Sequence, residues 1–125
     1  MTQIKNEIFV REAKNSDREY VFKFCEKTWE WGDYIPDVWD QWLQEPNGRL
    51  FVATRNGIPV GIGNVIFSKP GEAWLIGIRT DPEYRRRGIA TALINNRIEY
   101  SKKHKANVVR TGTLSDNFAI QAVYR

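Results

Sequence analysis

The sequence holds one cysteine among its 125 residues, and it has neither a long apolar run nor an apolar leader. Cys25 cannot form a disulfide within the chain, which fits a reducing compartment. No segment approaches the ~20 apolar residues that a membrane-spanning helix requires. The opening residues, MTQIKNEIFV, lack the apolar region of a signal peptide. These absences favour a cytoplasmic protein without a membrane partner.

Internal repeats, linkers and low-complexity tracts are missing too, so residues 1–125 are expected to form a single domain. The net charge of +4 suits a partner that carries phosphates, but the 15 acidic residues are interspersed among the 19 basic ones. That mixture does not require nucleic acid. The five tryptophans are expected to serve core packing first and a binding cleft second.

Hydrophobic periodicity and turn signals predict a mixed α/β fold in the order β-α-α-β-β-β-α-β-α. Asn56–Gly57 favours the tight turn of a hairpin. Ser16 and Glu19 have the spacing of a capping box at the start of the first helix. The predicted elements are a strand at 8–11, helices after 16 and from 36, a hairpin over 50–68, a strand at 73–80, a helix at 89–103, a strand at 107–114 and a helix from 115.

Two packing expectations follow from these elements. The strands at 73–80 and 107–114 are predicted to be parallel neighbours, because the helix between them has the length of a crossover connection. In the first helix, Cys25 lies on the apolar stripe and is expected to be a core residue rather than a nucleophile. In the helix at 89–103, the predicted buried stripe is Ala90, Ile94 and Ile98, with Ile89 and Leu93 beside it.

Three consecutive arginines stand between the end of a predicted strand and the start of a predicted helix. The first N–H groups of a helix have no internal acceptor, and the helix dipole adds partial positive charge there. Gly88 has no side chain and Ala90 has a small one, so an anion can approach the backbone closely. A flanking arginine can bind two phosphate oxygens at once through its guanidinium. Residues 85–91, here called the cradle, therefore predict a pyrophosphate site. No P-loop sequence is present.

Two other interpretations of the arginine run are a solvated surface and a nucleic-acid-binding patch. Nucleic-acid binding usually requires basic charge spread over a face, with exposed aromatic residues between the charges for single strands. Here Asp81 and Glu83 precede the run, and Tyr84 is the nearest aromatic residue. The localised cradle is favoured over both.

The segment RRRGIA, residues 85–90, resembles the R/Q-x-x-G-x-G/A signature of the GNAT superfamily of N-acetyltransferases. NFAIQAVY, residues 117–124, is similar to a later motif of that family, an asparagine followed seven residues on by tyrosine. The motifs stand in the family's order, and the resemblance covers the chain from the first strand to Tyr124. It implies a GNAT-like, mixed and mostly antiparallel sheet flanked by helices. It also implies acetyl transfer from acetyl-CoA to a primary amine by direct attack.

The resemblance implies a role for each matching position. Backbone groups at 78–80 would pair with the pantetheine arm of acetyl-CoA, and an N–H of this strand would polarise the thioester carbonyl. Tyr124 would protonate the departing thiolate as a general acid. Neither a metal ion nor an acyl-cysteine is implied. The implied cofactor-binding residues are Ile78, Arg79, Thr80, Arg85, Arg86, Arg87, Gly88, Ile89, Ala90, Thr91 and Asn117.

Two features depart from the family pattern. Many relatives carry a glutamate five residues before the motif asparagine as the general base, and here that position is Gly112. Glu72, Asp33 or a water chain are the remaining candidates for this base. The family fold also continues with two strands past the motif tyrosine, whereas the sequence ends at Arg125. The domain is therefore expected to be truncated or to be completed by another chain, as in a homodimer. A non-catalytic acyl-CoA-binding module or an inactive fragment is the alternative function.

The segment WEWGDYIPDVW, residues 29–39, falls where the family often lines its acceptor site. Trp31 and Tyr34 would form an aromatic wall, and Asp33 would attract an ammonium group. Packing of the helix pair onto the sheet is an equally favoured role for these aromatic residues. The segment also loosely resembles tryptophan-rich loops of amino-acid N-acetyltransferases, which would indicate a small amine or amino acid as the acceptor.

Overall fold

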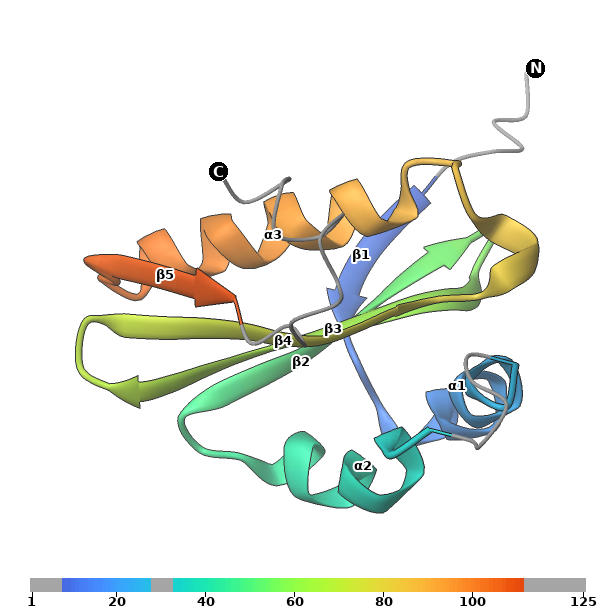
Figure 1. Ribbon diagram of the computed structural model, residues 1–125, viewed down its shortest axis with the longest axis horizontal. Helices are drawn as coiled ribbons and strands as arrows, with labels where there is room; N and C mark the ends of the chain where they lie inside the picture. Colours follow the sequence, from blue (N-terminus) through green and yellow to red (C-terminus); the bar gives the residue numbers. More distant parts are fainter. Residues whose placement is uncertain (1–7, 28–32, 112–125) are drawn as a thin grey trace.

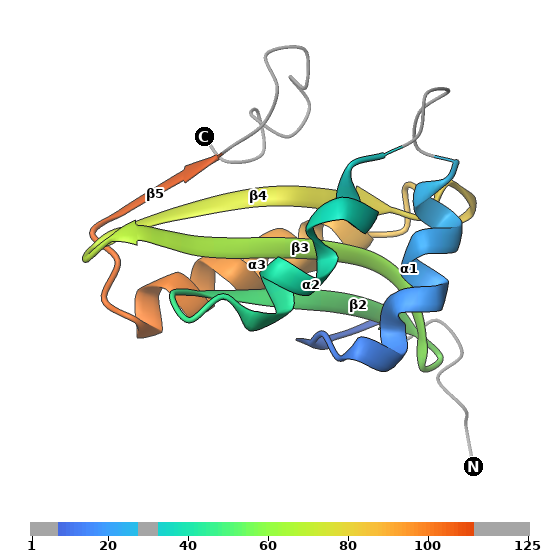
Figure 2. The same ribbon diagram turned by 90° about the horizontal axis from the view of Figure 1, so that it is seen from below.

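The computed structural model describes residues 8–27 and 33–111, which form a five-stranded sheet with helices on both faces (Figure 1). One face carries α3, and the other carries α1 and α2 (Figure 2). The strands lie in chain order, and every neighbouring pair is antiparallel except β4 with β5. The elements are β1 (Ile8–Glu12), a 3-10 turn η1 (Asn15–Asp17), α1 (Arg18–Cys25), α2 (Ile35–Gln44), β2 (Gly48–Arg55), β3 (Ile58–Lys69), β4 (Glu72–Thr80), a 3-10 turn η2 (Pro82–Tyr84), α3 (Ile89–Lys103) and β5 (Val108–Thr111).

The predicted order of elements is confirmed as far as β5, and the predicted last helix lies outside the described residues. The hairpin turn is formed by Asn56 and Gly57, whose φ angles of 53° and 83° are those that a two-residue turn between antiparallel strands requires. The parallel pair is also confirmed, since the β4 residues 72–75 lie opposite the β5 residues 108–111. Within the described ranges, none of the helices is both long and apolar enough to span a membrane.

Two apolar clusters hold the helices to the sheet. Val21 of α1 and Trp39 of α2 are buried against one face, and Ile89 and Leu93 of α3 are buried against the other. Trp42 of α2 is buried as well, with its ring edge-on to Tyr34. The tryptophans of α2 therefore serve the core, as the composition led us to expect.

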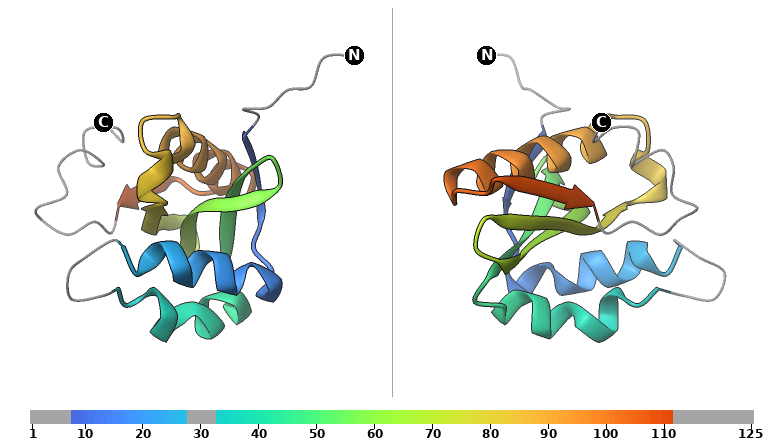
Figure 3. Two further views of the ribbon diagram at one scale, coloured as in Figure 1. Left: turned by 90° about the vertical axis from the view of Figure 1, so that its right-hand side faces the viewer. Right: turned by 60° about the vertical axis from the view of Figure 1, so that its left-hand side comes forward.

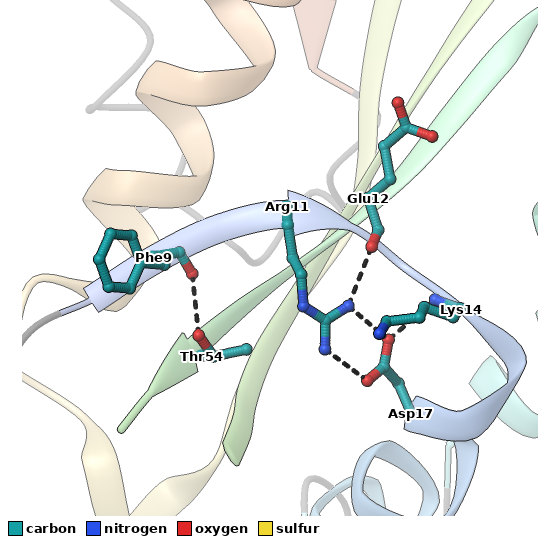
Figure 4. A network of polar contacts seen from close by, with 6 residues as sticks. All are labelled: Phe9, Arg11, Glu12, Lys14, Asp17 and Thr54. Carbon is teal, nitrogen blue, oxygen red and sulfur yellow. Dashed lines mark hydrogen bonds and ion pairs between the residues drawn. The ribbon is translucent and has the colours of Figure 1, made fainter. Parts of the chain in front are cut away.

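The first helix begins differently from the prediction. The expected capping box of Ser16 and Glu19 is wrong, because the chain enters α1 through the 3-10 turn η1. Asp17 instead accepts hydrogen bonds from the Lys14 backbone N–H at 2.8 Å and from both terminal nitrogens of Arg11, at 2.9 and 2.8 Å (Figure 4). Burial acts to raise the pKa of Asp17, but these hydrogen bonds hold it below its usual value. An ion pair with β1 therefore fixes the start of the helix.

The helix α3 has the predicted bounds, but its buried face is shifted from the predicted stripe. Ala90 and Ile98 are only partly buried, whereas Arg97 and Ser101 are fully buried. An arginine on an apolar stripe was not expected, because charged side chains are seldom fully buried unless they have partners. The contacts of Arg97 explain this exception.

The guanidinium of Arg97 lies between two strands of the sheet. It donates hydrogen bonds to the carbonyls of Asn64 in β3, at 2.9 Å, and of Ile76 in β4, at 3.2 Å. A Cβ atom at Gly63 would lie 2.8 Å from its central carbon, so only glycine leaves room for the guanidinium there. Arg97 therefore joins β3 to β4 from the α3 side.

The side chain of Asn64 is fully buried, and neither its amide nitrogen nor its amide oxygen has a hydrogen-bond partner among the described residues. A buried polar group without a partner costs about 1–3 kcal/mol. We expect Asn64→Leu, which removes the amide and keeps the branching at Cγ, to raise the free energy of unfolding by about 1 kcal/mol or more. Urea unfolding measures this change. A loss of stability would show that the amide is satisfied in solution.

Cys25 is 1% exposed and lies in the cluster between α1, α2 and the sheet, as predicted for a core residue. Burial, with a smaller contribution from Asp33, raises the pKa of its thiol to about 12. At pH 8 the folded chain should therefore react with a thiol reagent on the order of a thousandfold more slowly than the chain in urea, because only the thiolate reacts. Similar labelling rates in both states would contradict this expectation.

Candidate functional site

The cradle lies in the connection from β4 to α3, at the end of the sheet where the β2–β3 turn also lies (Figure 3). Asp81 fixes the start of this connection, because its N–H donates to the Val60 carbonyl at 2.8 Å and its carboxylate accepts from the Glu83 N–H at 3.0 Å. Arg86 and Gly88 then both have positive φ angles, 64° and 81°. The backbone thus adopts the left-handed conformation at two residues immediately before α3.

The N-terminus of α3 is open to an anion. Gly88 is its N-cap, no side chain caps the helix there, and its first turn carries no acidic residue. Apart from its neighbours in the chain, no described residue has an atom within 4 Å of the position that a Cβ atom at Gly88 would take, so the described part of the chain leaves the space beside this backbone open. The three arginines of the cradle are exposed. This arrangement fits a pyrophosphate, since the first N–H groups of a helix and arginine side chains both bind phosphate oxygens.

A cavity of about 430 Å³ adjoins the cradle on the side of the β2–β3 turn. The guanidinium carbons of Arg55 and Arg87 lie 5.5 and 5.7 Å from the centre of the Tyr84 ring. The side chain of Arg87 is therefore directed toward this cavity. The sequence did not indicate the cavity, because Arg55 and Tyr84 stand nearly thirty residues apart. The lining residues are Arg55, Asn56, Ile58, Glu83, Tyr84 and Arg87.

The strand predicted to bind pantetheine bends at Gly77. This residue has a φ of 66°, and a Cβ atom there would lie 2.5 Å from the Trp42 ring. The register between β3 and β4 shifts at the same place. Among the described residues, β5 pairs with β4 only over 72–75, so the edge of β4 after the bend has no β5 partner in that range. The predicted residues Ile78, Arg79 and Thr80 belong to this part of the strand.

Arg79 has a role that the sequence did not predict. Its Nε donates to Oδ2 of Asp33 at 2.7 Å and its Nη2 to Oδ1 at 3.1 Å, and the two side chains are only 11% and 1% exposed. Its Nη1 also donates to the carbonyl of Ile78, and its guanidinium carbon lies 5.1 Å from the centre of the Tyr34 ring. Burial acts to lower the pKa of Arg79, but the hydrogen bonds to Asp33 hold it above its usual value. The pair joins the segment before α2 to the end of β4.

These contacts bear on the residues proposed for the acceptor and the base. Both carboxylate oxygens of Asp33 are bonded to Arg79, so Asp33 is neither a free ammonium-binding group nor a free base. Glu72 lies at the start of β4, six residues before Ile78, or about 20 Å along an extended strand. A hydrogen bond from Arg110 at 2.7 Å lowers the pKa of Glu72, which makes it a weak base. Neither carboxylate is therefore suited to the role.

Residues 78–80 lie at the end of β4 that leads into the cradle, and the binding roles predicted for both segments stay predictions. Trp31, Asn117 and Tyr124 lie outside the described residues, and their roles stay predictions.

Sequence reasoning missed Arg97, although two signals were available. Arg97 falls three and four residues after Ile94 and Leu93 on the apolar stripe, and Gly63 interrupts β3 where a large side chain needs room. In the described part of the chain, no three His, Cys, Asp or Glu side chains gather as a metal site would require.

Comparison with known proteins is consistent with this arrangement. The family model described as the acetyltransferase (GNAT) family matches residues 13–125. An uncharacterized N-acetyltransferase of Methanocaldococcus jannaschii is 36% identical over 89 residues, which cover 61% of this chain and 38% of that protein. The histidine N-acetyltransferase of Scomber australasicus is 30% identical over 86 residues, which cover 68% of this chain and 26% of that protein. The chain thus matches well under half the length of these relatives.

Solved structures share the fold. The ribosomal-protein-S18-alanine N-acetyltransferase of Escherichia coli aligns with a TM-score of 0.79 and 20% identity, covering 94% of this chain and 74% of that one. The aminoglycoside N-acetyltransferase AAC(6')-Iy in complex with CoA aligns with a TM-score of 0.76 and 19% identity, covering 99% of this chain and 88% of that one. At 19% and 20% sequence identity, these similarities show a shared fold and nothing more about this chain.

Proposed function

Because the chain belongs to the acetyltransferase (GNAT) family, we propose that it transfers an acetyl group from acetyl-CoA to a primary amine. The N-terminus of α3 carries the proposal. It combines an uncapped helix start, an open space at Gly88 and three exposed arginines. These groups match the charge and the hydrogen-bond acceptors of a pyrophosphate. A solved relative of this fold in complex with CoA supports the same ligand.

The proposed reaction needs few protein groups. The amine nitrogen attacks the thioester carbonyl, and the carbon–sulfur bond breaks as the thiolate of CoA leaves. The N–H groups of β4 after Gly77 are suited to polarise that carbonyl, because this edge of the strand has no β5 partner in the described range. Tyr124 is the proposed donor of the proton to the thiolate. With Asp33 and Glu72 engaged in ion pairs, a water chain is the proposed route for the proton that leaves the amine.

For the acceptor we propose a free amino acid. Two of the relatives are named histidine N-acetyltransferase, one from Scomber australasicus and one from Oreochromis niloticus. The described part of the expected acceptor segment places Tyr34, which is 45% exposed, over the guanidinium of Arg79. An assay that detects the released CoA thiol measures the rate of acetyl transfer. It compares free amino acids with peptides and polyamines as acceptors. Transfer to peptides alone would overturn the choice of acceptor and leave acetyl transfer standing.

Isothermal calorimetry with acetyl-CoA tests the function itself. We expect one molecule of acetyl-CoA to bind each chain, with a smaller affinity for acetyl-pantetheine, which lacks the pyrophosphate. A folded chain that binds neither ligand would overturn the proposal. The alternative function, a non-catalytic acyl-CoA-binding module, is motivated by the absence of a free carboxylate base among the described site residues. It predicts binding without transfer to any amine, so measured acetyl transfer excludes it.

A further inference from the structure

A second cavity, of about 420 Å³, lies at the end of the sheet opposite the cradle. Three segments meet there, namely the connection from α2 to β2, the turn from β3 to β4, and the C-terminus of α3 (Figure 1). The cradle lies at the other end of α3, and the 15 residues of this helix span about 20 Å. The proposed acetyl transfer therefore makes no use of this cavity.

Backbone hydrogen bonds fix the three segments to one another. The N–H of Phe67 in β3 donates to the carbonyl of Asn47 at 2.7 Å, which holds the α2–β2 connection against the hairpin. The N–H groups of Asn107 and Val108 donate to the carbonyl of Gly71, at 2.7 and 3.0 Å, which holds the chain after α3 against the β3–β4 turn. The cavity is therefore preformed, and its volume is within the range of about 300 to 1,000 Å³ that is usual for small-molecule sites.

Flat rings form the apolar part of the lining. The half-buried ring of Tyr100 stacks on the ring of His104, with their centres 4.0 Å apart and 26° between their planes. An edge-on contact with Phe51, at 5.5 Å between ring centres, joins Tyr100 to the core below α3. The proline rings at 46 and 70 belong to the lining as well. Such flat apolar surfaces suit a planar ring as the ligand.

The polar part of the lining attracts an anion. Lys69 is the only charged side chain among the lining residues when His104 is neutral. The charge of Lys69 also attracts Glu72, at the start of β4. Glu72, however, already accepts hydrogen bonds from Arg110 at 2.7 Å and from Ser68 at 3.0 Å. A single lysine, in a lining without arginine, suits the one charge of a carboxylate better than the two charges of a phosphate.

The orientation of His104 adds a hydrogen-bond acceptor. Its Nδ1 lies 2.9 Å from the carbonyl oxygen of Tyr100. A carbonyl oxygen only accepts, so Nδ1 carries the hydrogen of the neutral ring, and Nε2 is then an acceptor. A hydroxyl group on the ligand is suited to donate to Nε2.

We propose that this cavity binds a small aromatic carboxylate that carries a ring hydroxyl. Lys69 pairs with the carboxylate, and Nε2 of His104 accepts from the hydroxyl. The ring lies against Tyr100 and the two prolines. Because this site and the cradle lie at opposite ends of α3, it stands whether or not the chain transfers acetyl groups.

Calorimetry at pH 8 with three probes of one size tests the charge requirement. The probe 4-hydroxyphenylacetate carries a carboxylate, 4-hydroxyphenylacetamide is neutral, and tyramine carries an ammonium. We expect the carboxylate to bind one molecule per wild-type chain, at least about tenfold more tightly than either of the others, because a hydrogen bond to a charged group contributes about 1.5–3 kcal/mol. Equal affinity for the three probes, or no binding of the carboxylate at millimolar concentration, overturns the proposal. Neither result requires a variant to fold.

A substitution at Lys69 tests where the carboxylate binds. Lys69→Gln should weaken binding of 4-hydroxyphenylacetate at least about tenfold, since the charged partner is lost. Lys23→Gln is the matched control, because it removes the same charge from an exposed position on α1, on the other face of the sheet from α3. It should leave the affinity unchanged. Equal losses in the two variants would assign the binding to net charge, and unchanged affinity in Lys69→Gln would place the probe elsewhere, so either result overturns the site.

A substitution at His104 tests the contact with the hydroxyl. Phenylacetate lacks this group, and we expect it to bind the wild-type chain several times more weakly than 4-hydroxyphenylacetate does. His104→Phe keeps a ring that can stack on Tyr100 but has no nitrogen, so it should bind both probes about equally. A preference for the hydroxyl that His104→Phe preserves would overturn the role proposed for His104.

Discussion

Replacing Arg79 by methionine is expected to lower the free energy of unfolding by about 3 to 5 kcal/mol. Methionine fills much of the same space but leaves the carboxylate of Asp33, which is 1% exposed, without its arginine. Removing one partner of a buried ion pair is far more costly than removing the whole pair. Unfolding in urea, followed by circular dichroism, measures the loss.

Two further variants identify the cause of that loss. Adding Asp33→Asn to Arg79→Met should restore at least half of the lost stability, because the buried charge is then removed. Arg49→Met is the matched control, since Arg49 pairs with Glu12 at 3.7 Å and both side chains are well exposed. An exposed pair contributes about 1 kcal/mol or less. Equal losses for Arg79→Met and Arg49→Met would show that the buried pair does not hold the segment before α2.

Acetyl-CoA is expected to bind Gly88→Glu at least tenfold more weakly than it binds the wild-type chain. The new side chain would start beside the N-terminus of α3, where no described residue apart from its chain neighbours comes within 4 Å of its Cβ position. If the pyrophosphate binds there as proposed, the carboxylate would repel it and occupy its volume. The fold should survive, because the cost is that of a side chain at a φ of 81°, about 1 to 2 kcal/mol. Calorimetry gives the affinity, and thermal unfolding gives the stability.

Gly88→Gln and Gly88→Ala separate charge from backbone strain. Glutamine has the size of glutamate without its charge, and alanine has the same backbone strain with little bulk. All three variants should lose similar stability. Affinity for acetyl-CoA should fall in the order alanine, glutamine, glutamate. Wild-type affinity in all three variants would place the pyrophosphate away from the cradle.

Local chemistry made most of the fold predictable. Asn56–Gly57 determines a hairpin because few other dipeptides adopt positive φ at both positions, and both φ angles are positive here. The crossover length of α3 likewise determined the parallel pairing of β4 with β5. The start of α1 was mispredicted because a local signal, Ser16 with Glu19, competed with a tertiary ion pair from Arg11 to Asp17. The tertiary contact prevailed, and sequence spacing does not reveal it.

The local geometry of the cradle, a glycine N-cap that follows three exposed arginines, was predictable because it lies within seven consecutive residues. The rest of the site depends on residues that are distant in the sequence. Asp33 and Arg79 are 46 positions apart, and only the fold shows that they pair. The same holds for Arg55 with Tyr84, whose contact arises because the β2–β3 turn and the connection before α3 share one end of the sheet. Spacing arguments therefore predict the backbone geometry of one connection more readily than they predict pairs of distant side chains.

The strand order also has a consequence for folding kinetics. β2, β3 and β4 form a meander of close neighbours in the sequence, and α3 follows directly, whereas β1 joins β2 only after the chain from 13 to 47 has closed into a loop. Closing a long loop costs entropy before its contacts form, and non-local pairing is slow. In pulse-labelling hydrogen exchange during refolding, we expect amides of β3 and α3 to gain protection before those of β1. Simultaneous protection would contradict this order. The half of the molecule that carries the cradle would then assemble first, and α1 and α2 would dock onto a sheet that already exists.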